Sequence, residues 1–256
     1  MKKFIRRLLI FICVVCLAFT GFQIYQYLNE FHKEDVDDAK LIAEITSSEQ
    51  SSESKNEEFT PDASTYGKLH SINSDYRGWL KWNSNMISTP IMQNSSEDAY
   101  YLKHNIYKNV VIGGSAFIES DASLDDQNLT IYGHSVFYSN TQTTGQMFSR
   151  LRNLETQTGY ENNKGFKIYW ENDISVYEVY AVCEIDESTN TWSFERKNFT
   201  DSEFQDWLSN ANKKNLIKPS ITADSGSKYV TFQTCKYREG SERIIVIGKE
   251  IERISY

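Results

Sequence analysis

The chain has 256 residues, a length that allows one substantial folded domain together with terminal extensions. Aromatic residues make up 14% of it, with 16 Tyr and 14 Phe, and this composition favours β structure. The formal net charge is −8 and no basic stripe runs along the sequence, which argues against nucleic acid as a partner.

The N-terminal segment has the composition of a membrane anchor. Residues 1–7 carry four basic and no acidic side chains, and the next 21 residues, 8–28, are almost wholly apolar. Such a stretch can span about 30 Å of hydrocarbon, and the basic flank predicts a cytoplasmic N-terminus with the rest of the chain outside. A cleaved signal peptide is the alternative. The span length, the lack of a small-x-small cleavage site, and Tyr25 and Tyr27 as interfacial anchors favour an uncleaved single-pass anchor over residues 1–28.

Residues 29–65 form an acidic, Ser/Glu-rich spacer. Through residue 66 this segment holds 11 acidic and three basic side chains, and the excess of eight equals the net charge of the whole chain. Residues 46–55 are too polar to bury a core. We predict a short helix at the membrane end, then a flexible solvated tether without a binding role, and a folded domain over residues 66–256.

The folded domain is predicted to consist mainly of short strands. A helix or turn that begins near Leu69 leads into the first of them. Short segments that are either apolar or alternate apolar and polar side chains, and that are bounded by turn residues, predict strands. They lie at 79–82, 90–93, 115–118, 128–134, 166–170 and 174–185. Residues 135–145 are predicted to be a polar loop.

Two amphipathic helices are predicted between the strands. The first covers residues 146–154, where the apolar positions are Met147, Phe148, Leu151 and Leu154. The second begins after the capping box formed by Thr200 and Glu203. Many short strands with few helices indicate an all-β barrel or sandwich that carries helical insertions.

Two strands near the C-terminus carry candidate reactive residues. Residues 229–235 alternate apolar and polar side chains and end on Cys235, and Arg243 opens a second strand of β-branched residues. If the two strands pair as a hairpin, Arg243 lies beside Cys235. Cys183 sits in a strand-like run and is interpreted as a small buried hydrophobic residue. No C-x-x-C pair has His partners at ligand spacing, so we predict neither a zinc site nor a disulfide framework.

One of the four histidines stands apart from the others. His32, His70 and His104 have the sequence context of ordinary surface or hydrogen-bonding residues. His134 ends a predicted strand directly after a glycine, which lets the backbone turn sharply and expose the ring. A Cys and a His distant in sequence are only a candidate pair, so the residues alone leave a His134–Cys235 dyad open beside the ordinary role.

Motifs in a fixed order from about Leu69 to the C-terminus resemble those of class B sortases. They are Asn73-x-Asp75-x-x-Gly78-Trp79, Pro90-Ile91-Met92-Gln93, Tyr100-Tyr101-Leu102, Gly114-Ser115-Ala116-Phe117, Tyr132-Gly133-His134, Met147-Phe148, Thr234-Cys235 and Arg243. The resemblance implies a mainly β fold: a closed barrel of about eight strands with N-terminal helices and a long helix before the Cys235 strand.

The resemblance also implies an activity and roles for individual residues. Cys235 would be the nucleophile of a cysteine transpeptidase, His134 its acid and base, and Arg243 the group that holds substrate and stabilises the oxyanion. The implied substrates are secreted proteins with a C-terminal sorting motif cleaved after Thr, and an amine from a peptidoglycan precursor or a pilin Lys. No metal or cofactor is implied. Residues assigned to substrate binding are Leu102, Tyr132, Gln233 and Thr234.

The sequence departs from the class B pattern near the site. Gln233 stands where a Ser is usual, and the segment 135–146 after His134 is several residues longer than usual. Both changes leave the sorting motif and the acceptor open, so wall anchoring and pilin polymerisation remain alternatives. An inactive membrane-anchored scaffold of the same fold and a cysteine protease are the other readings.

Overall fold

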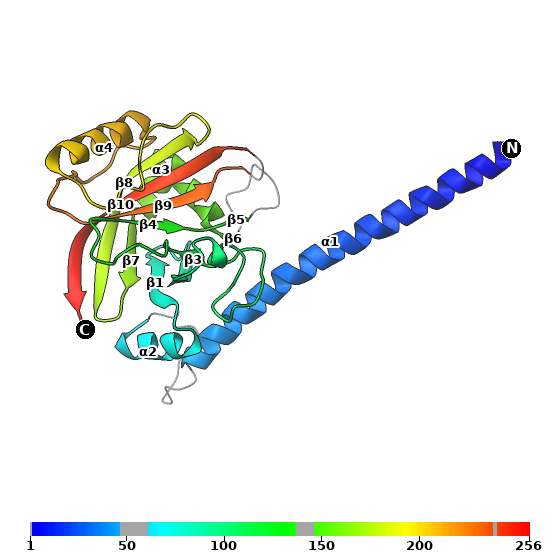
Figure 1. Cartoon of the computed structure of the whole chain (residues 1–256), viewed down its shortest axis with the longest axis horizontal. Coiled ribbons are helices and arrows are strands. Elements are labelled where there is room, and N and C mark those ends of the chain that lie inside the picture. The colour runs from blue at the N-terminus through cyan, green and yellow to red at the C-terminus, as the bar shows by residue number, and fades with distance from the viewer. Residues whose placement is uncertain (1, 47–60, 137–145, 238–239) are drawn as a thin grey trace. The chain divides into compact units, whose positions relative to one another are not determined.

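The computed structural model describes residues 2–46, 61–136, 146–237 and 240–256. By its contacts the chain divides into two compact units, Met1–Lys55 and Asn56–Tyr256 (Figure 1). The first unit contains the helix α1 (Lys2–Thr46), and the second contains every strand described.

Helix α1 is longer than the sequence predicts. Its Phe4–Gln26 stretch is long and apolar enough to cross a membrane. The helix then continues to Thr46, through a segment for which only a short helix is predicted. Residues 29–46 contain no Gly or Pro, and three Glu, two Lys, two Ala and one Leu are good helix formers, so nothing interrupts the helix. Most of the predicted tether, residues 47–60, lies outside the described residues.

Eight strands close into a barrel, which confirms the predicted fold class. Their order is β1-β2-β3-β4-β9-β10-β8-β7, and β7 pairs with β1 to complete the circle. Two neighbouring pairs, β2/β3 and β4/β9, are parallel. The bounds are β1 Tyr76–Trp82, β2 Ser88–Met92, β3 Ala116–Phe117, β4 Asn128–Tyr132, β7 Gly165–Tyr169, β8 Asp173–Asp186, β9 Tyr229–Cys235 and β10 Glu242–Ser255.

Apolar side chains form two cores, one on each face of the strands β8 to β10. The barrel interior contains Trp82 and Phe166, whose rings stack at 4.5 Å, together with Phe232. The outer core lies under α4 (Asp201–Lys214), where Trp207 packs against Tyr229. Figure 1 shows α4 lying along the outer side of the sheet beside β8. Burial on both faces explains the nearly continuous Val/Ile run of β10.

The helices of the second unit begin at recognisable signals. Helix α2 (Ala63–Ile72) has Asp62 as N-cap and begins slightly before residue 66, the predicted start of the domain. Helix α4 has both hydrogen bonds of the predicted capping box. The remaining elements are η1 (Tyr100–Leu102), η2 (Phe148–Glu155), α3 (Gln157–Asn163) and the small sheet β5 (Ser135–Val136) with β6 (Gln146–Met147).

The amphipathic helix predicted over residues 146–154 is a 3₁₀-helix that begins at Phe148, after the two residues of β6. In η2 the buried apolar residues are Phe148, Leu151 and Leu154, spaced three apart. Three residues per turn is the 3₁₀ repeat, so this spacing lines up one face of η2. Of the predicted loop, residues 135 and 136 form β5, and 137–145 lie outside the described residues.

Candidate active site

The register of three neighbouring strands brings the predicted reactive residues to one end of the barrel. In the parallel pair β4/β9, Tyr132 lies opposite Gln233. His134 and Cys235 each follow two residues later. In the antiparallel pair β9/β10, Cys235 lies opposite Arg243, which confirms the predicted hairpin. We call Tyr132, His134, Gln233, Cys235 and Arg243 the strand-end cluster.

The four members of the cluster that lie on strands, Tyr132, Gln233, Cys235 and Arg243, face outward because side chains alternate along each strand. Ile131, Phe232 and Ile244 point into the barrel core, so their neighbours Tyr132, Gln233 and Arg243 point to the outer face. Residues directly opposite in a pair share a face, which places the Cys235 and Arg243 side chains together. This is also the face that α4 covers nearer the start of β9, through Tyr229.

Thr234 joins the two strand ends from the barrel side. Its side chain is buried, and its hydroxyl donates a hydrogen bond of 2.9 Å to the backbone oxygen of Gly133. The Gly133 N–H in turn donates to the backbone oxygen of Gln233 at 3.3 Å. These two bonds fix the backbone that carries His134 against the backbone that carries Cys235.

Phe148 holds the His134 segment from the other side. Its N–H donates to the His134 backbone oxygen at 3.1 Å. Its ring lies so close to Gly133 that a Cβ there would be 2.5 Å from Phe148 Cδ2, a separation that side chains do not tolerate. Met147, just before it, has a φ of 51°, in the region that favours glycine. A strained residue and a required glycine therefore set the position of the His134 backbone.

The surroundings of His134 favour its neutral form. Burial, and secondarily the positive charge of Lys103, lower the pKa of its imidazole. Lys103 directly follows Leu102 at the end of η1, and Leu102 is half-buried. The backbone oxygen of Leu102 would lie 2.5 Å from a Cβ on Gly114, whose φ is +62°, so only glycine fits this close approach.

Arg243 is held by three acceptors. Its Nη1 donates hydrogen bonds to the backbone oxygens of Gly240 and Glu242, both at 3.1 Å. Its Nη2 forms an ion pair of 2.6 Å with Glu187 Oε2. Sequence reasoning missed Glu187, because its position depends on the register in which β8 pairs with β10.

Tyr132 of β4 and Gln233 of β9 form the side of the strand-end cluster that lies away from Arg243 of β10. The Tyr132 hydroxyl donates to Glu119 Oε1 at 3.0 Å. Burial and the Glu119 carboxylate raise the pKa of this phenol far above its usual value, so it stays a neutral hydrogen-bond donor. Gln233 is half-buried.

Lys236, the residue after Cys235, is a second residue that the sequence analysis missed. Its ammonium pairs with Glu184 of β8 and lies 3.8 Å from Glu155 Oε1 of η2. The Lys236 side chain is only 12% exposed and that of Glu155 19%, whereas Glu184 is 39% exposed, so water screens the pair with Glu155 less than the pair with Glu184. The pair with Glu155 ties the end of the Cys235 strand to the 3₁₀-helix that begins with Phe148.

The four cysteines differ in their capacity to react. Cys183 is fully buried, as predicted, and burial raises the pKa of its thiol to about 12. Cys13 and Cys16 are exposed on α1, within the apolar stretch. Cys235 is half-exposed at a strand end beside an arginine. Only a thiolate is nucleophilic, and of the two cysteines in the second unit Cys235 is the one that a substrate can reach.

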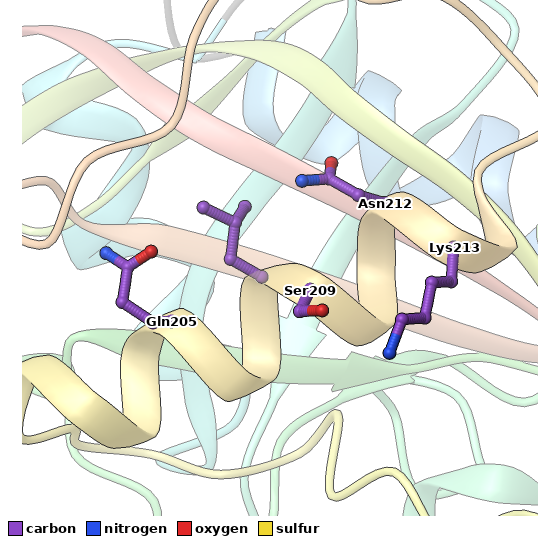
Figure 2. A pocket seen from close by; sticks show the side chains of 5 residues that line it. Gln205, Ser209, Asn212 and Lys213 are labelled. Carbon is purple, nitrogen blue, oxygen red and sulfur yellow. The ribbon is translucent and has the colours of Figure 1, made fainter.

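No predicted site residue lines the one pocket drawn in Figure 2. That pocket has a volume of about 370 Å³ and is lined by α4 side chains alone, namely Gln205, Leu208, Ser209, Asn212 and Lys213 (Figure 2). Among the described residues, no group of three His, Cys, Asp or Glu side chains could hold a metal ion.

Comparisons with known proteins identify the family. The sequence matches the Sortase domain family over residues 83–251. It is 26% identical over 259 residues to sortase B of Staphylococcus aureus (strain NCTC 8325 / PS 47), an alignment that covers 98% of each chain. A mutant form of Clostridium perfringens sortase B is 29% identical and superposes with a TM-score of 0.67, over 75% of this chain and 88% of that chain.

A further solved structure shares the fold. The Staphylococcus aureus sortase B–substrate complex superposes with a TM-score of 0.71 at 21% identity, over 87% of this chain and 99% of that chain. The family match covers more than half of the chain and includes His134, Cys235 and Arg243. The chain therefore belongs to the sortase family of cysteine transpeptidases, and its relatives place it in class B.

Proposed function

We propose that Cys235, His134 and Arg243 are the catalytic residues of this transpeptidase. The observation that carries the proposal is the register of β4, β9 and β10. It aligns Cys235 with Arg243 and sets His134 at the same level on the neighbouring strand. A nucleophile, an acid/base and a cation on one exposed strand end are the groups that acyl transfer requires.

The proposed reaction has two steps that balance in protons. His134 takes the proton of the Cys235 thiol, and the resulting thiolate attacks the carbonyl carbon of a Thr in the sorting motif. Arg243 stabilises the oxyanion. Collapse breaks the peptide bond, and protonated His134 gives its proton to the leaving amine. Neutral His134 then takes a proton from the incoming amine as that amine attacks the thioacyl group. Collapse of the second intermediate releases an amide and restores the thiolate.

The proposed substrates lie outside the cell. The basic residues before Phe4–Gln26 favour a cytoplasmic N-terminus and a membrane-anchored enzyme whose catalytic domain faces outward. In this scheme residues 1–28 anchor the chain, 29–65 form the spacer and 66–256 act on secreted proteins. The acyl group passes to a cell-wall amine. Neither step requires a metal, so a chelator should leave the rate unchanged.

A peptide panel tests the proposal. The chain is incubated with peptides that carry different sorting motifs, each with and without a wall-type oligoglycine or a pilin-type Lys peptide, and the products are identified by mass spectrometry. We expect an amide with the oligoglycine that is absent in Cys235→Ala. A preference for the Lys peptide would instead identify a pilin-polymerising enzyme. Cleavage that ignores added amine would identify a protease. An unreactive Cys235 with every peptide and with a small thiol reagent would identify an inactive scaffold.

A further inference from the structure

We propose that Glu187 is a positioning residue that orients Arg243 for transfer. The inference rests on the proposed function, because it assigns a task to Glu187 only through Arg243. Glu187 directly follows β8, whose last residue Asp186 lies opposite Glu242. Its carboxylate therefore approaches the guanidinium from the strand on the far side of β10 from Cys235.

The three contacts of Arg243 leave a defined part of the guanidinium for substrate. A guanidinium carries five N–H donors in a planar fork. Nη1 donates to two backbone oxygens and Nη2 pairs with Glu187, so two N–H groups are taken by no described residue. Since the fork is rigid, fixing Nη1 and Nη2 also fixes the direction of the remaining donors.

A network of short hydrogen bonds fixes Glu187 itself. Its N–H donates to the Ser241 oxygen at 2.9 Å, which continues the pairing of the two strands by one residue. The Asp186 carboxylate accepts from the Ser188 N–H at 3.0 Å and from the Ser241 hydroxyl at 2.5 Å. The Ser188 hydroxyl, followed by the Ser241 hydroxyl and the Ser188 N–H, lowers the pKa of Asp186, which keeps this carboxylate ionised. The turn that carries Glu187 is thus locked to the segment that leads into Arg243.

The energetics favour a role in orientation over a role in stability. The Glu187 side chain is 50% exposed, and an exposed ion pair contributes little to the free energy of unfolding. The effect on the rate of catalysis should be larger, since a displacement of about 1 Å of a catalytic group can lower a rate by about 100-fold. Removing Glu187 should therefore affect turnover far more than folding.

The test uses the full chain in detergent micelles, with the best-cleaved peptide of the panel and triglycine as acceptor. For Glu187→Ala we expect kcat to fall about 10- to 100-fold, with KM changed by less than about twofold because the loss falls on the transition state. The melting temperature should move by less than about 2 °C. Glu187→Asp, which keeps the charge on a shorter side chain, should recover part of kcat. The matched control Glu252→Ala removes an exposed carboxylate from the distal part of β10 and should leave kcat unchanged.

A double-mutant cycle separates the possible failures. If Glu187 acts through Arg243, adding Glu187→Ala to Arg243→Ala changes the residual kcat by less than about twofold. Two results would overturn the inference while Arg243→Ala remains defective. In one, the double variant loses kcat by the product of the two single losses; in the other, Glu187→Ala has a normal or raised kcat. A fully active Arg243→Ala enzyme would instead overturn the proposed role of Arg243, and with it the task assigned to Glu187.

Discussion

At the residue scale, the environment of His134 sets its protonation. Burial is the larger cause of its lowered pKa, and Lys103 adds to it. A neutral imidazole is ready to accept the proton of the incoming amine, which is the second step of the proposed reaction. In the first step the same group must carry a proton, so its pKa governs the balance between the two steps.

Lys103→Met should raise the pKa of His134 part of the way towards its usual value of 6.5, because burial remains after the charge is removed. The measurement is an NMR titration of the imidazole Cε1–H. Lys213→Met, on α4, is the matched control and should leave the titration unchanged. A His134 pKa that does not move, or that falls, in Lys103→Met would contradict this account of its environment.

The lowered pKa also has a consequence for stability. Above pH 6.5 the imidazole is neutral in the folded and the unfolded chain, and its titration does not change the free energy of unfolding. As the pH falls below 6.5 the unfolded chain takes up the proton first, so His134 lowers the stability of the fold until the folded pKa is passed. Lys103→Met should bring the folded pKa of His134 closer to the unfolded value of 6.5. The free energy of unfolding should then fall less as the pH is lowered below 6.5.

At the element scale, the contact between η2 and the end of β4 positions His134. Phe148 reaches Gly133 with its ring and His134 with its N–H, so one residue of η2 controls both the space and the hydrogen bonding there. Any side chain at position 133 must displace a fully buried aromatic ring.

Gly133→Ala should therefore lower both stability and turnover. Overpacking of a buried site costs about 1–3 kcal/mol, and displacement of the His134 backbone should lower kcat about tenfold or more. The matched control is Gly67→Ala in α2, where a Cβ meets nothing within 4 Å and helix propensity improves. Denaturant unfolding and peptide turnover measure the two effects. If Gly133→Ala and Gly67→Ala had the same free energy of unfolding and the same kcat, the close contact of Gly133 with Phe148 would contribute to neither stability nor turnover.

Helix α4 offers a separate test of how its start is stabilised. Glu203 accepts from the Thr200 N–H at 2.9 Å, and the Thr200 hydroxyl accepts from the Glu203 N–H at 3.4 Å. Thr200→Ala should cost about 1 kcal/mol, or about 2–4 °C in melting temperature for a domain of this size, without changing kcat. Ser202→Ala, an exposed position of the first turn, should cost nothing. A Thr200→Ala loss no larger than that of Ser202→Ala would mean that the cap contributes nothing.

At the scale of the whole molecule, the two faces of one sheet have different tasks. The inner faces close the barrel core, and the outer face of β8 to β10 is divided along its length. Near the start of β9 it is covered by α4, while the end of β9 presents Cys235 beside Arg243. The outer core thus stabilises the strands whose ends carry the proposed chemistry.

Much of this arrangement could be predicted from sequence because it depends on local patterns. Alternation in residues 229–235 gives a strand that ends on Cys235, and the β-branched run after Arg243 gives its hairpin partner. The capping box gives the start of α4. Roles for His134, Leu102, Tyr132, Gln233 and Thr234 followed from family resemblance and stay predictions.

Other features could not be predicted, because they depend on pairing between distant segments. The ion pair of Glu187 with Arg243 needs the register of β8 against β10, which no local pattern specifies. The contacts of Lys236 need the packing of η2 against the barrel. The 3₁₀ geometry of η2 was missed because apolar residues at 147, 148, 151 and 154 also fit an α-helical repeat.

The most direct test of the central claim is to locate the acyl group on the enzyme. The full chain is mixed with a cleavable sorting-motif peptide without an amine acceptor, quenched in acid, digested, and mapped by mass spectrometry. We predict a thioacyl adduct on Cys235 alone that disappears when triglycine is added and an amide product forms. An adduct on Cys13, Cys16 or Cys183, or undiminished amide formation by Cys235→Ala, would contradict the account.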